Sequence, residues 1–407
     1  MSDTMSLSNR EWKEYKFSDF VDISPTVSLK GGIDYSFIEM KDLQDGSKYC
    51  IPSAKRTLSG GARFAEGDTL FARITPCLEN GKICKVKGLE NGVGFGSTEF
   101  LIFRGKENIS DNDFVFYLSR WDEVRGFAES NFEGTSGRQR VPKNCFDNLH
   151  LDLPSVTEQK SIATILSSLD DKIDLLHRQN KTLEQLAETL FRQWFVEEAD
   201  ESWETRKLFD IADVQNGYAF KSSDYVSFQE GFLEVLKMGH IERGGGLRSN
   251  PKRDFIPRND KLKRWILNTN DIVMAMTDMK DNVVILGVPA MIDKDDNYVL
   301  NQRVARISLK RNSELINKYL LYVQLKDPEF IAVLQSKSNS GVQVNLSIEV
   351  IKDCDIIVPP IEVQTEKGTT ITNLYLKKEK NQIQIRTLTQ LRDTLLPKLM
   401  SGEVRVE

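Results

Sequence analysis

Two short polar loops carry residue types that can contact the edges of DNA bases, and they recur in the two halves of the chain. The first runs from Thr135 to Arg140 and the second from Asn339 to Asn345. An arginine can form a pair of hydrogen bonds with guanine, and glutamine or asparagine can do so with adenine. The loop residues that we predict to contact DNA are Ser136, Arg138, Gln139, Arg140 and the adjacent Lys143 in the first half, and Ser340, Gln343 and Asn345 in the second. The alternative is a structural turn that joins a helix to a strand.

Basic side chains that can bind DNA phosphates are most concentrated between Arg248 and Arg264. This stretch holds seven arginines and lysines but only two acids, Asp254 and Asp260. The residues predicted to bind DNA there are Arg248, Lys252, Arg253, Arg258, Lys261 and Lys263. Further predicted DNA-binding residues are Lys55, Arg56, Arg73 and Thr75 in the first half, and Thr277, Lys280 and Asn282 in the second. A solvated charged loop is the alternative to DNA contact.

The sequence contains no recognisable catalytic set or metal site. His150, His177 and His240 are scattered, and none stands at metal-ligand spacing from cysteines or carboxylates. Gly244–Gly246 lacks the lysine and the serine or threonine of a phosphate-binding loop, and we find no glycine-rich S-adenosylmethionine motif. We therefore predict no catalytic activity, no metal and no cofactor in this chain.

A long helix predicted over residues 154–199 must hold these loops in place. Its apolar residues, from Ile162 to Trp194, recur at alternating steps of four and three, which is typical of a coiled-coil seam. Ser155 and Glu158 fit a capping box at its start. Roughly 42 residues at 1.5 Å each would give a rod of about 60 Å.

The same helix appears again over residues 359–407. At an offset of 205 residues, Pro154 aligns with Pro359 and Gln159 aligns with Gln364. The segments before the two helices also resemble each other, because GDTLFARITP aligns with NDIVMAMTDM. An internal repeat of this size decides the architecture.

We predict an α+β fold made of four segments. Residues 1–153 and 200–358 form two globular α/β domains, and residues 154–199 and 359–407 form two long helices. Each domain should contain several buried strands, one of which is expected over residues 283–291 of the second domain. Each should also contain an amphipathic helical segment, over residues 111–129 in the first domain and 313–335 in the second.

Composition limits the setting and the partners. The formal net charge of −5 gives no overall attraction to nucleic acid, so DNA contact would need local basic patches. No apolar run reaches the ~20 residues that a membrane span needs. The five cysteines form no CxxC pair, and their odd number argues against a disulfide framework. We therefore expect a cytoplasmic protein without a membrane partner.

The order of domain, helix, domain and helix resembles the specificity (S) subunit of type I restriction-modification systems. The resemblance rests on LPSVTEQKSIATILSSLDDKID with LEQLAETLF, on the second copy VPPIEVQTEK with LRDTLLPKLMSGE, and on the strand GDTLFARITP. It covers nearly the whole chain. The second copy departs from the family's proline-x-x-Glu-Gln helix start, because Val363 stands where the first copy has Glu158. The contact that this glutamate makes at the helix start is therefore not predicted for the second copy.

The resemblance implies a DNA-recognition subunit without catalysis of its own. In this family the two helices pack antiparallel as an intramolecular coiled coil, and each target-recognition domain reads one half of a split, asymmetric DNA site. Helix length then fixes the unread spacer. The implied partners are double-stranded DNA, two methyltransferase (M) subunits that use S-adenosylmethionine, and restriction (R) subunits that use ATP and Mg. The alternative function is a coiled-coil scaffold whose globular domains bind protein rather than DNA.

Asn180 and Asn381 interrupt the apolar seams of the two predicted helices. In an antiparallel pair with a pseudo-dyad near residue 178, position 180 lies opposite position 381. We predict that the two amides hydrogen-bond and fix the register of the helices, at some cost in stability. The alternative is that both side chains are solvated.

Overall fold

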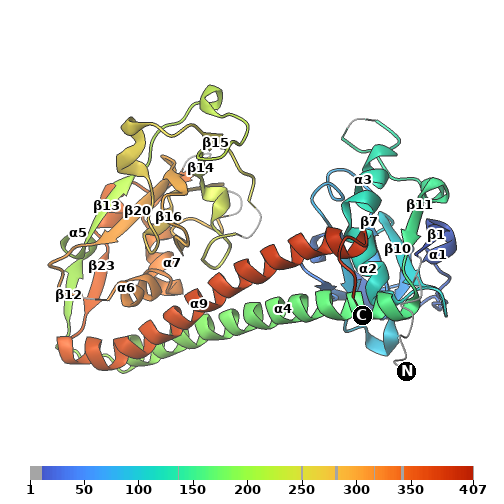
Figure 1. The fold of residues 1–407 in the computed structure, drawn as a ribbon. Coiled ribbons are helices and arrows are strands. Elements are labelled where there is room, and N and C mark those ends of the chain that lie inside the picture. The colour runs from blue at the N-terminus through green and yellow to red at the C-terminus, as the bar shows by residue number, and fades with distance from the viewer. Residues whose placement is uncertain are drawn as a thin grey trace, which may run out of the picture. The chain divides into compact units, whose positions relative to one another are not determined.

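The computed structural model describes residues 12–135, 137–248, 251–279, 283–315, 317–340 and 343–406 (Figure 1). The chain divides into two compact units. Unit 1 holds the residues up to His177 together with those from Ile383 onward, and unit 2 holds Arg178–Gln382. Both units contain sheets and helices, so the fold is α+β. These units cut across the four predicted segments because each long helix contributes to both, and the four-segment division stays a prediction.

Unit 1 is built on a five-stranded sheet with the order β2-β10-β7-β8-β4. Its central strand β7 (Thr69–Ala72) is buried at every position, as expected for the apolar run in GDTLFARITP. A second sheet has the order β5-β3-β9-β6, and a two-stranded sheet pairs β1 with β11. The other elements are β1 (Lys13–Lys16), α1 (Phe17–Phe20), β2 (Val21–Ile23), β3 (Asp34–Ile38), β4 (Tyr49–Cys50), β5 (Ala54–Thr57), β6 (Ala62–Ala65), β8 (Ile83–Val86), β9 (Val93–Gly96), β10 (Phe100–Gly105), α2 (Asn112–Arg120), α3 (Asp122–Ser130) and β11 (His150–Leu153).

Unit 2 repeats this plan with the four-stranded sheet β13-β20-β16-β18. Its strand β16 (Ile272–Ala275) is buried throughout and is the counterpart of β7. Two three-stranded sheets have the orders β15-β14-β19 and β17-β22-β21, and β12 pairs with β23. The other elements are β12 (Glu204–Lys207), α5 (Leu208–Ile211), β13 (Ala212–Asn216), β14 (Leu233–Leu236), β15 (Phe255–Ile256), β17 (Thr277–Met279), β18 (Pro289–Met291), β19 (Tyr298–Leu300), β20 (Val304–Leu309), α6 (Lys318–Leu325), α7 (Pro328–Ser336), β21 (Asn339–Ser340), β22 (Gln343–Asn345), α8 (Ile348–Lys352) and β23 (Asp355–Val358).

Three predicted elements differ from the observed ones. The predicted helix over residues 111–129 is two helices, because Trp121 is extended (φ −65°, ψ 138°) between α2 and α3. Its counterpart over residues 313–335 is likewise divided into α6 and α7, where Asp327 caps the new helix that starts at Pro328. The strand predicted over residues 283–291 is confined to β18, because the backbone before it forms turns around the buried Asp278 carboxylate.

The long helices are α4 (Val156–Arg192) and α9 (Ile361–Met400), and a glutamine anchors the start of each. Gln159 Nε2 donates to the carbonyl oxygens of Ile109 (3.1 Å) and Pro154 (2.9 Å). Gln364 Nε2 makes the matching contacts one repeat later, to Glu314 O (2.9 Å) and Pro359 O (2.8 Å). The repeat of 205 residues therefore extends to individual hydrogen bonds.

The predicted capping box at the start of α4 forms only in part. The backbone N–H of Glu158 reaches Ser155 Oγ at 3.4 Å, but its carboxylate accepts a hydrogen bond from Trp12 Nε1 (3.1 Å) instead of closing the box. In the second copy, Val363 and Trp203 both pack against an apolar core. The departure in sequence thus replaces a partly buried hydrogen bond with apolar packing of Val363 against the core.

Helices α4 and α9 lie side by side (Figure 1) and run antiparallel within each unit. In unit 1, Asp170 Oδ1 lies 2.7 Å from Arg392 Nη1, and Leu176 shares an apolar cluster with Ile385. Residue numbers thus fall along α9 as they rise along α4.

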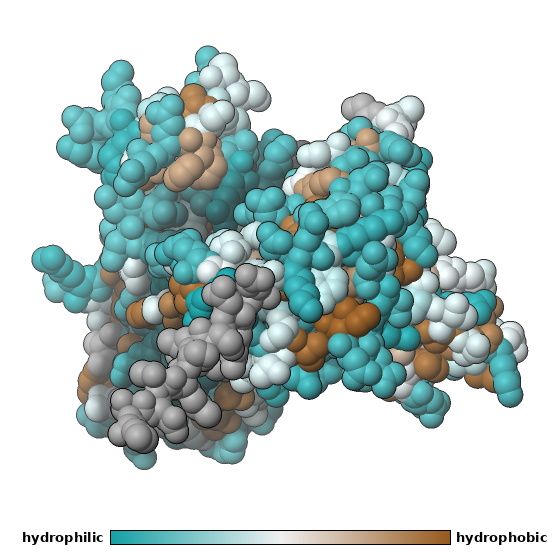
Figure 2. Space-filling view, turned by 45° about the vertical axis from the view of Figure 1, so that its right-hand side comes forward, coloured by the Kyte–Doolittle hydropathy of each residue, from teal (hydrophilic) through white to brown (hydrophobic). Residues whose placement is uncertain are grey.

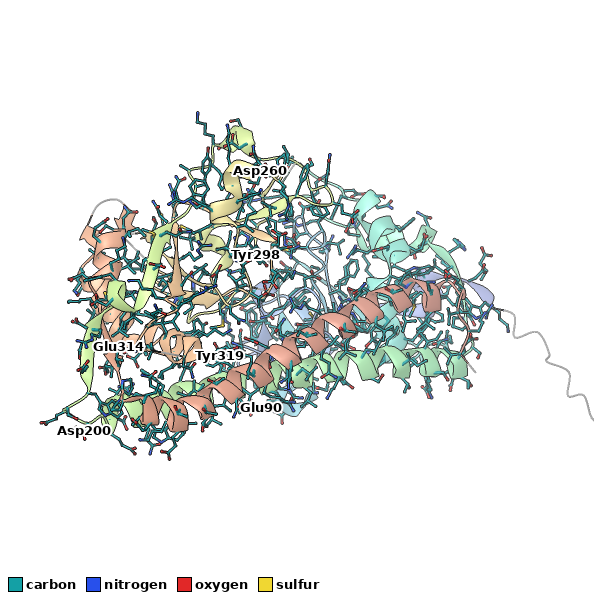
Figure 3. The ribbon with its side chains drawn as sticks, turned by 60° about the vertical axis from the view of Figure 1, so that its left-hand side comes forward. Glu90, Asp200, Asp260, Tyr298, Glu314 and Tyr319 are labelled. Carbon is teal, nitrogen blue, oxygen red and sulfur yellow. The ribbon has the colours of Figure 1, made fainter. Side chains whose placement is uncertain are left out.

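The same reversal holds in unit 2. Asn381 Nδ2 donates to Asn180 Oδ1 at 3.0 Å, and Glu184 Oε2 lies 2.7 Å from Lys378 Nζ. Tyr319 of α6, labelled in Figure 3, donates from its hydroxyl to Glu379 Oε1 of α9 at 2.8 Å. The two asparagines therefore make the contact that the sequence predicts, while their role in setting the register stays a prediction.

Candidate nucleic-acid interface

The polar loop of unit 1 is attached to the end of the central strand β7. The backbone N–H of Val141 donates to Arg73 O (2.7 Å), and the N–H of Thr75 donates to Gln139 O (3.0 Å). The N–H of Gln139 in turn donates to Thr75 Oγ1 at 3.0 Å. Candidates far apart in sequence are therefore brought together at one end of the sheet, because the loop continues the β-pairing of the strand.

The charged side chains of this cluster differ in whether they already have an ion-pair partner. Arg140 contacts Glu99 through Nε (2.9 and 3.0 Å) and Nη2 (2.7 Å), and this hydrogen bonding raises the pKa of Arg140. Arg138 and Lys143 are exposed and have no ion-pair partner among the described residues. The Nε atom of Arg73 is buried without a hydrogen-bond partner in the part of the chain that is described. In the unit 1 loop, the Arg138 guanidinium is therefore more accessible to a ligand than that of Arg140, which is held by Glu99.

Two further candidates of unit 1 lie on the other sheet. Lys55 and Arg56 belong to β5, where they form ion pairs with Glu90 and Glu39 respectively. The Arg56 guanidinium also lies 4.1 Å from the centre of the Phe37 ring. No hydrogen bond or ion pair among the described residues joins them to the Thr75–Arg140 cluster.

Unit 2 builds the same attachment from different residues. The N–H of Leu346 donates to Met276 O at 2.8 Å, which matches the contact of Val141 with Arg73. Thr277 of β17 pairs with Asn345 of β22, and Thr277 Oγ1 donates to Asn345 Oδ1 at 2.9 Å. The candidates Ser136, Lys280 and Asn282 lie outside the described residues, as do the side chains of Ser340 and Gln343.

Asp278, next to Thr277, holds the neighbouring turn. It is 5% exposed, and its carboxylate accepts hydrogen bonds from the backbone N–H groups of Met279 (2.8 Å), Val284 (2.7 Å) and Ile285 (2.6 Å). A carboxylate that is buried and satisfied by the backbone supports the fold. The turn it organises carries the chain back toward β18.

Most basic residues between 248 and 264 have acidic partners. The ion pairs are Arg248 with Glu242 (3.4 Å), Arg253 with Glu234 (3.6 Å), Arg258 with Asp296 (2.6 Å) and Lys263 with Asp260 (2.9 Å). Asp260, labelled in Figure 3, lies in the 3-10 helix Asp260–Trp265. Lys252 and Lys261 are exposed and have no ion-pair partner among the described residues. The pairs of Arg248, Arg258 and Lys263 are exposed and contribute only about 0–1 kcal/mol each, so a phosphate can compete for these cations.

Sequence reasoning missed an aromatic surface beside these cations. Tyr218 is 39% exposed, and its ring centre lies 5.0 Å from that of Trp265. The guanidinium of Arg264 lies 5.2 Å from the Trp265 ring centre. Exposed aromatic rings flanked by arginine are suited to stacking on bases or sugars. Sequence gave no signal for Tyr218, because its neighbour Trp265 lies 47 residues away and the contact follows only from strand pairing.

Sequence reasoning also missed Arg303, which precedes β20. Its backbone carbonyl accepts from Met276 N–H at 3.0 Å, so it lies beside the Thr277–Asn345 pair. Its side chain is exposed and has no ion pair or hydrogen bond with any described residue. A single arginine after a buried strand carries no signal in the sequence.

His240 is held in a buried structural pair. Its Nε2 lies 3.0 Å from Glu234 Oε1, and its Nδ1 accepts the backbone N–H of Lys237 at 3.2 Å. With Nδ1 an acceptor, Nε2 carries the proton that faces Glu234. The side chain is 3% exposed, so we assign it to the core of unit 2. The described residues contain no group of three or more His, Cys, Asp or Glu arranged to hold a metal ion.

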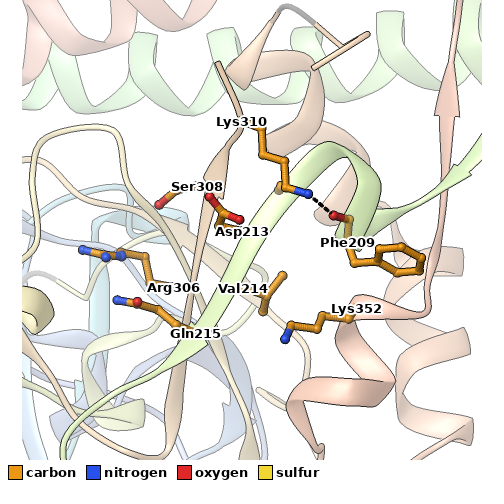
Figure 4. Close-up of a pocket in the computed structure, with 9 residues that line it drawn as sticks. Phe209, Asp213, Val214, Gln215, Arg306, Ser308, Lys310 and Lys352 are labelled. Atoms are coloured by element: carbon orange, nitrogen blue, oxygen red, sulfur yellow. Dashed lines mark hydrogen bonds between the residues drawn. The ribbon is translucent and has the colours of Figure 1, made fainter. Parts of the chain in front are cut away.

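A hollow of about 630 Å³ opens on unit 2 beside β13 and β20 (Figure 4). Arg306, Lys310 and Lys352 supply positive charge to its lining, and Asp213 supplies negative charge. The ammonium of Lys310 donates to the carbonyl oxygen of Phe209. None of the nine described residues that line it is a histidine or a cysteine, so it does not pair a nucleophile with an imidazole base.

The surface is mostly hydrophilic on the face shown in Figure 2, with separate hydrophobic patches. Scattered apolar side chains are normal on protein surfaces. Within the described residues, no helix combines the length and the apolar character needed to cross a bilayer.

Comparison with known proteins gives consistent matches over most of the chain. The family model described as the type I restriction modification DNA specificity domain matches twice, at residues 9–185 and 200–387. The chain is similar to the EcoAI specificity subunit of Escherichia coli, with 30% identity over 95% of this chain and 82% of that protein. It is also similar to the HindI specificity subunit of Haemophilus influenzae, with 25% identity over 97% of this chain and 100% of that protein.

A solved structure shares the fold. It is the S subunit of a type I restriction-modification system from M. genitalium, with a TM-score of 0.52 and 16% identity. The alignment covers 98% of this chain and 99% of that chain. The likeness thus extends over both units and both long helices.

Proposed function

This chain belongs to the family of type I restriction-modification DNA specificity subunits, and we propose that its two repeated domains each read one half of a split, asymmetric DNA site. The proposal covers the way the site is read, the spacer between its halves and the partners that act on it. It assigns no chemical step to this chain.

The repeated attachment of the polar loops carries the proposal. In both units a loop with Arg, Gln or Asn is tied to the end of the central strand by the same backbone bond, from Val141 to Arg73 and from Leu346 to Met276. The surrounding side chains differ between the units, as two readers of different half-sites require. Base edges are read by such side chains, whereas phosphate contacts only position the protein.

The unpaired cations support a DNA ligand rather than a protein ligand. Arg138, Lys252 and Lys261 are exposed without ion-pair partners among the described residues, although the chain as a whole is acidic. Local positive charge of this kind gives salt-dependent attraction to phosphates. The alternative function, a scaffold that binds protein through its globular domains, has no comparable support.

We assign the spacer to a coiled coil of α4 and α9. Helix α4 has 37 residues and α9 has 40. At 1.5 Å per residue these lengths correspond to about 55 and 60 Å. Half-sites one turn of DNA apart are separated by ~34 Å, so helices of this length are sufficient for a spacer.

Chemistry on DNA is assigned to partner subunits. Two methyltransferase (M) subunits would bind the helices and methylate adenine with S-adenosylmethionine, and restriction (R) subunits would supply DNA cleavage driven by ATP and Mg. The chain itself would bring them to the site. Free thiols at all five cysteines fit the cytoplasmic setting in which such a complex would act.

A selection experiment tests the proposed function. The chain is combined with its methyltransferase partners and incubated with genomic DNA fragments at several salt concentrations, and the bound fragments are sequenced. We expect one shared motif with two short defined parts separated by undefined positions. Bound fragments without any shared motif would overturn the proposal and favour the scaffold.

A further inference from the structure

We propose that Arg303 reads a guanine in the half-site bound by unit 2. The inference rests on the proposed function and deepens it by naming one residue and the base it recognises.

Backbone pairing makes Arg303 the structural counterpart of Glu99. In unit 1 the N–H of Arg73, after the central strand, donates to Glu99 O at 3.0 Å. In unit 2 the N–H of Met276, at the same place, donates to Arg303 O at 3.0 Å. The two residues therefore occupy one position of the repeated fold with opposite charge.

The exchange of charge changes what the neighbouring loop can do. In unit 1, Glu99 binds the guanidinium of Arg140. The same backbone pairing places Asn345 of unit 2 where unit 1 has Arg140, because Ile74 pairs with Arg140 and Thr277 pairs with Asn345. Unit 2 thus replaces a closed ion pair with an asparagine and an arginine that has no carboxylate partner among the described residues.

The side chain of Arg303 is free while its backbone is fixed. Its N–H donates to the side-chain oxygen of Asn301 at 3.1 Å, and Asn301 is 7% exposed. The guanidinium is exposed and makes no ion pair, hydrogen bond or ring contact with any described residue. Because the guanidinium is unengaged, no existing ion pair or hydrogen bond to a described residue must break when it binds a ligand.

The neighbours of Arg303 include partly exposed aromatic rings that are suited to stacking on bases. The preceding Gln302 donates from its N–H to Tyr218 O at 3.0 Å, which places the residue near the exposed aromatic surface. Arg306, within β20, is already engaged with the Ile266 carbonyl at 3.1 Å. Of the arginines near this end of the sheet, Arg303 is the one whose head is unengaged among the described residues.

Guanine is the base that this group recognises. It presents two acceptors, N7 and O6, in the major groove, and the guanidinium fork donates to both. Lysine keeps the charge but has no planar fork. Loss of one such bidentate contact changes discrimination between the correct and a wrong base by roughly 10- to 100-fold.

The test uses the full chain with its methyltransferase partners in a host without adenine methylation of its own. Methylated adenines are mapped genome-wide for the wild type and for Arg303→Ala, Arg303→Lys and Arg311→Ala. Arg311 is the matched control, because it is an exposed arginine that follows β20 while Arg303 precedes it. Thermal melting of each purified chain verifies folding.

We expect Arg303→Ala and Arg303→Lys to relax one G·C position of one half-site, with roughly 10- to 100-fold weaker discrimination there. Arg311→Ala should keep the wild-type motif. An unchanged motif in both Arg303 variants, or an equal loss at all sites, would overturn the base contact and indicate a phosphate contact. Should Arg303→Ala give no methylation, Arg303→Lys decides by the same criterion. A wild-type map without a split motif would instead refute the proposed function.

Discussion

Replacing Asn180 by leucine should destabilise the helix pair, because it leaves a buried amide without its partner. Asn180 is 6% and Asn381 is 1% exposed, and one hydrogen bond of 3.0 Å joins them. An unsatisfied buried polar group costs about 1–3 kcal/mol. We expect a loss of about 2 kcal/mol in the free energy of unfolding from either single substitution.

The double substitution Asn180→Leu with Asn381→Leu should behave differently. It removes both amides and completes the apolar seam, so the free energy of unfolding should return to within about 1 kcal/mol of wild type or exceed it. Since the two single losses sum to about 4 kcal/mol, the coupling between the two sites would then be about 3 kcal/mol or more.

Urea titration followed by circular dichroism measures the free energy of unfolding of the wild type, the two single variants and the double variant. Leu186→Ala is the control, because Leu186 lies on the same helix as Asn180 and is 44% exposed. It should change the free energy of unfolding by less than about 0.5 kcal/mol. A double variant whose loss equals the sum of the single losses would refute the reasoning, because the two amides would then act independently.

Three further predictions concern the joints between helices and domains. Gln159→Leu and Gln364→Leu should each lower the free energy of unfolding by about 2 kcal/mol in urea titration, because each orphans two backbone carbonyls, and unequal losses would contradict their equivalence. Arg392→Met should cost about 3–5 kcal/mol because it leaves Asp170 buried and unpaired, and adding Asp170→Asn should restore most of the loss; no recovery in thermal melting would argue against the pair. Burial alone would raise the pKa of Glu184, but Lys378 and Lys326 outweigh it and hold the pKa below its usual value of 4.5. The stability that the ionised carboxylate contributes is therefore present above pH 4.5 and is lost as the pH falls through the lowered pKa. Glu184→Gln should weaken this acid dependence of the free energy of unfolding in urea titrations at several pH values, and an unchanged dependence would contradict the assignment.

The repeat and the long helices could be predicted because their signals are local in sequence. A four-and-three spacing of apolar residues defines one buried stripe of a helix, whatever the stripe packs against. The position of Asn381 opposite Asn180 followed from that spacing, the 205-residue offset and the antiparallel packing that the family resemblance implied. Their hydrogen bond at 3.0 Å is what such a pattern predicts.

The ion pairing of the candidate site could not be predicted in the same way. Between Arg248 and Arg264 the sequence shows seven cations and two acids, yet Glu234, Glu242 and Asp296 enter from other segments. Ion pairing depends on which strands become neighbours, and that information is not local. The exchange of Glu99 for Arg303 was hidden for the same reason, since only backbone pairing shows that they share a position.

Some element boundaries also escaped sequence reasoning. The stretch before β18 is apolar enough for a strand, but the buried carboxylate of Asp278 captures the backbone N–H groups of Val284 and Ile285. Those groups are then unavailable to a sheet. A side chain that competes with strand pairing in this manner is recognised only when the turn is seen.

Mapping of methylated adenines tests the central claim most directly. The wild-type chain and its methyltransferase subunits are expressed in a host that lacks adenine methylation, and every modified adenine is located. We predict one motif with two defined parts, one undefined spacer of constant length between them, and one methylated adenine in each part on opposite strands. A continuous motif, a spacer of variable length, or methylation without any motif would contradict two readers held at a fixed distance by the paired helices.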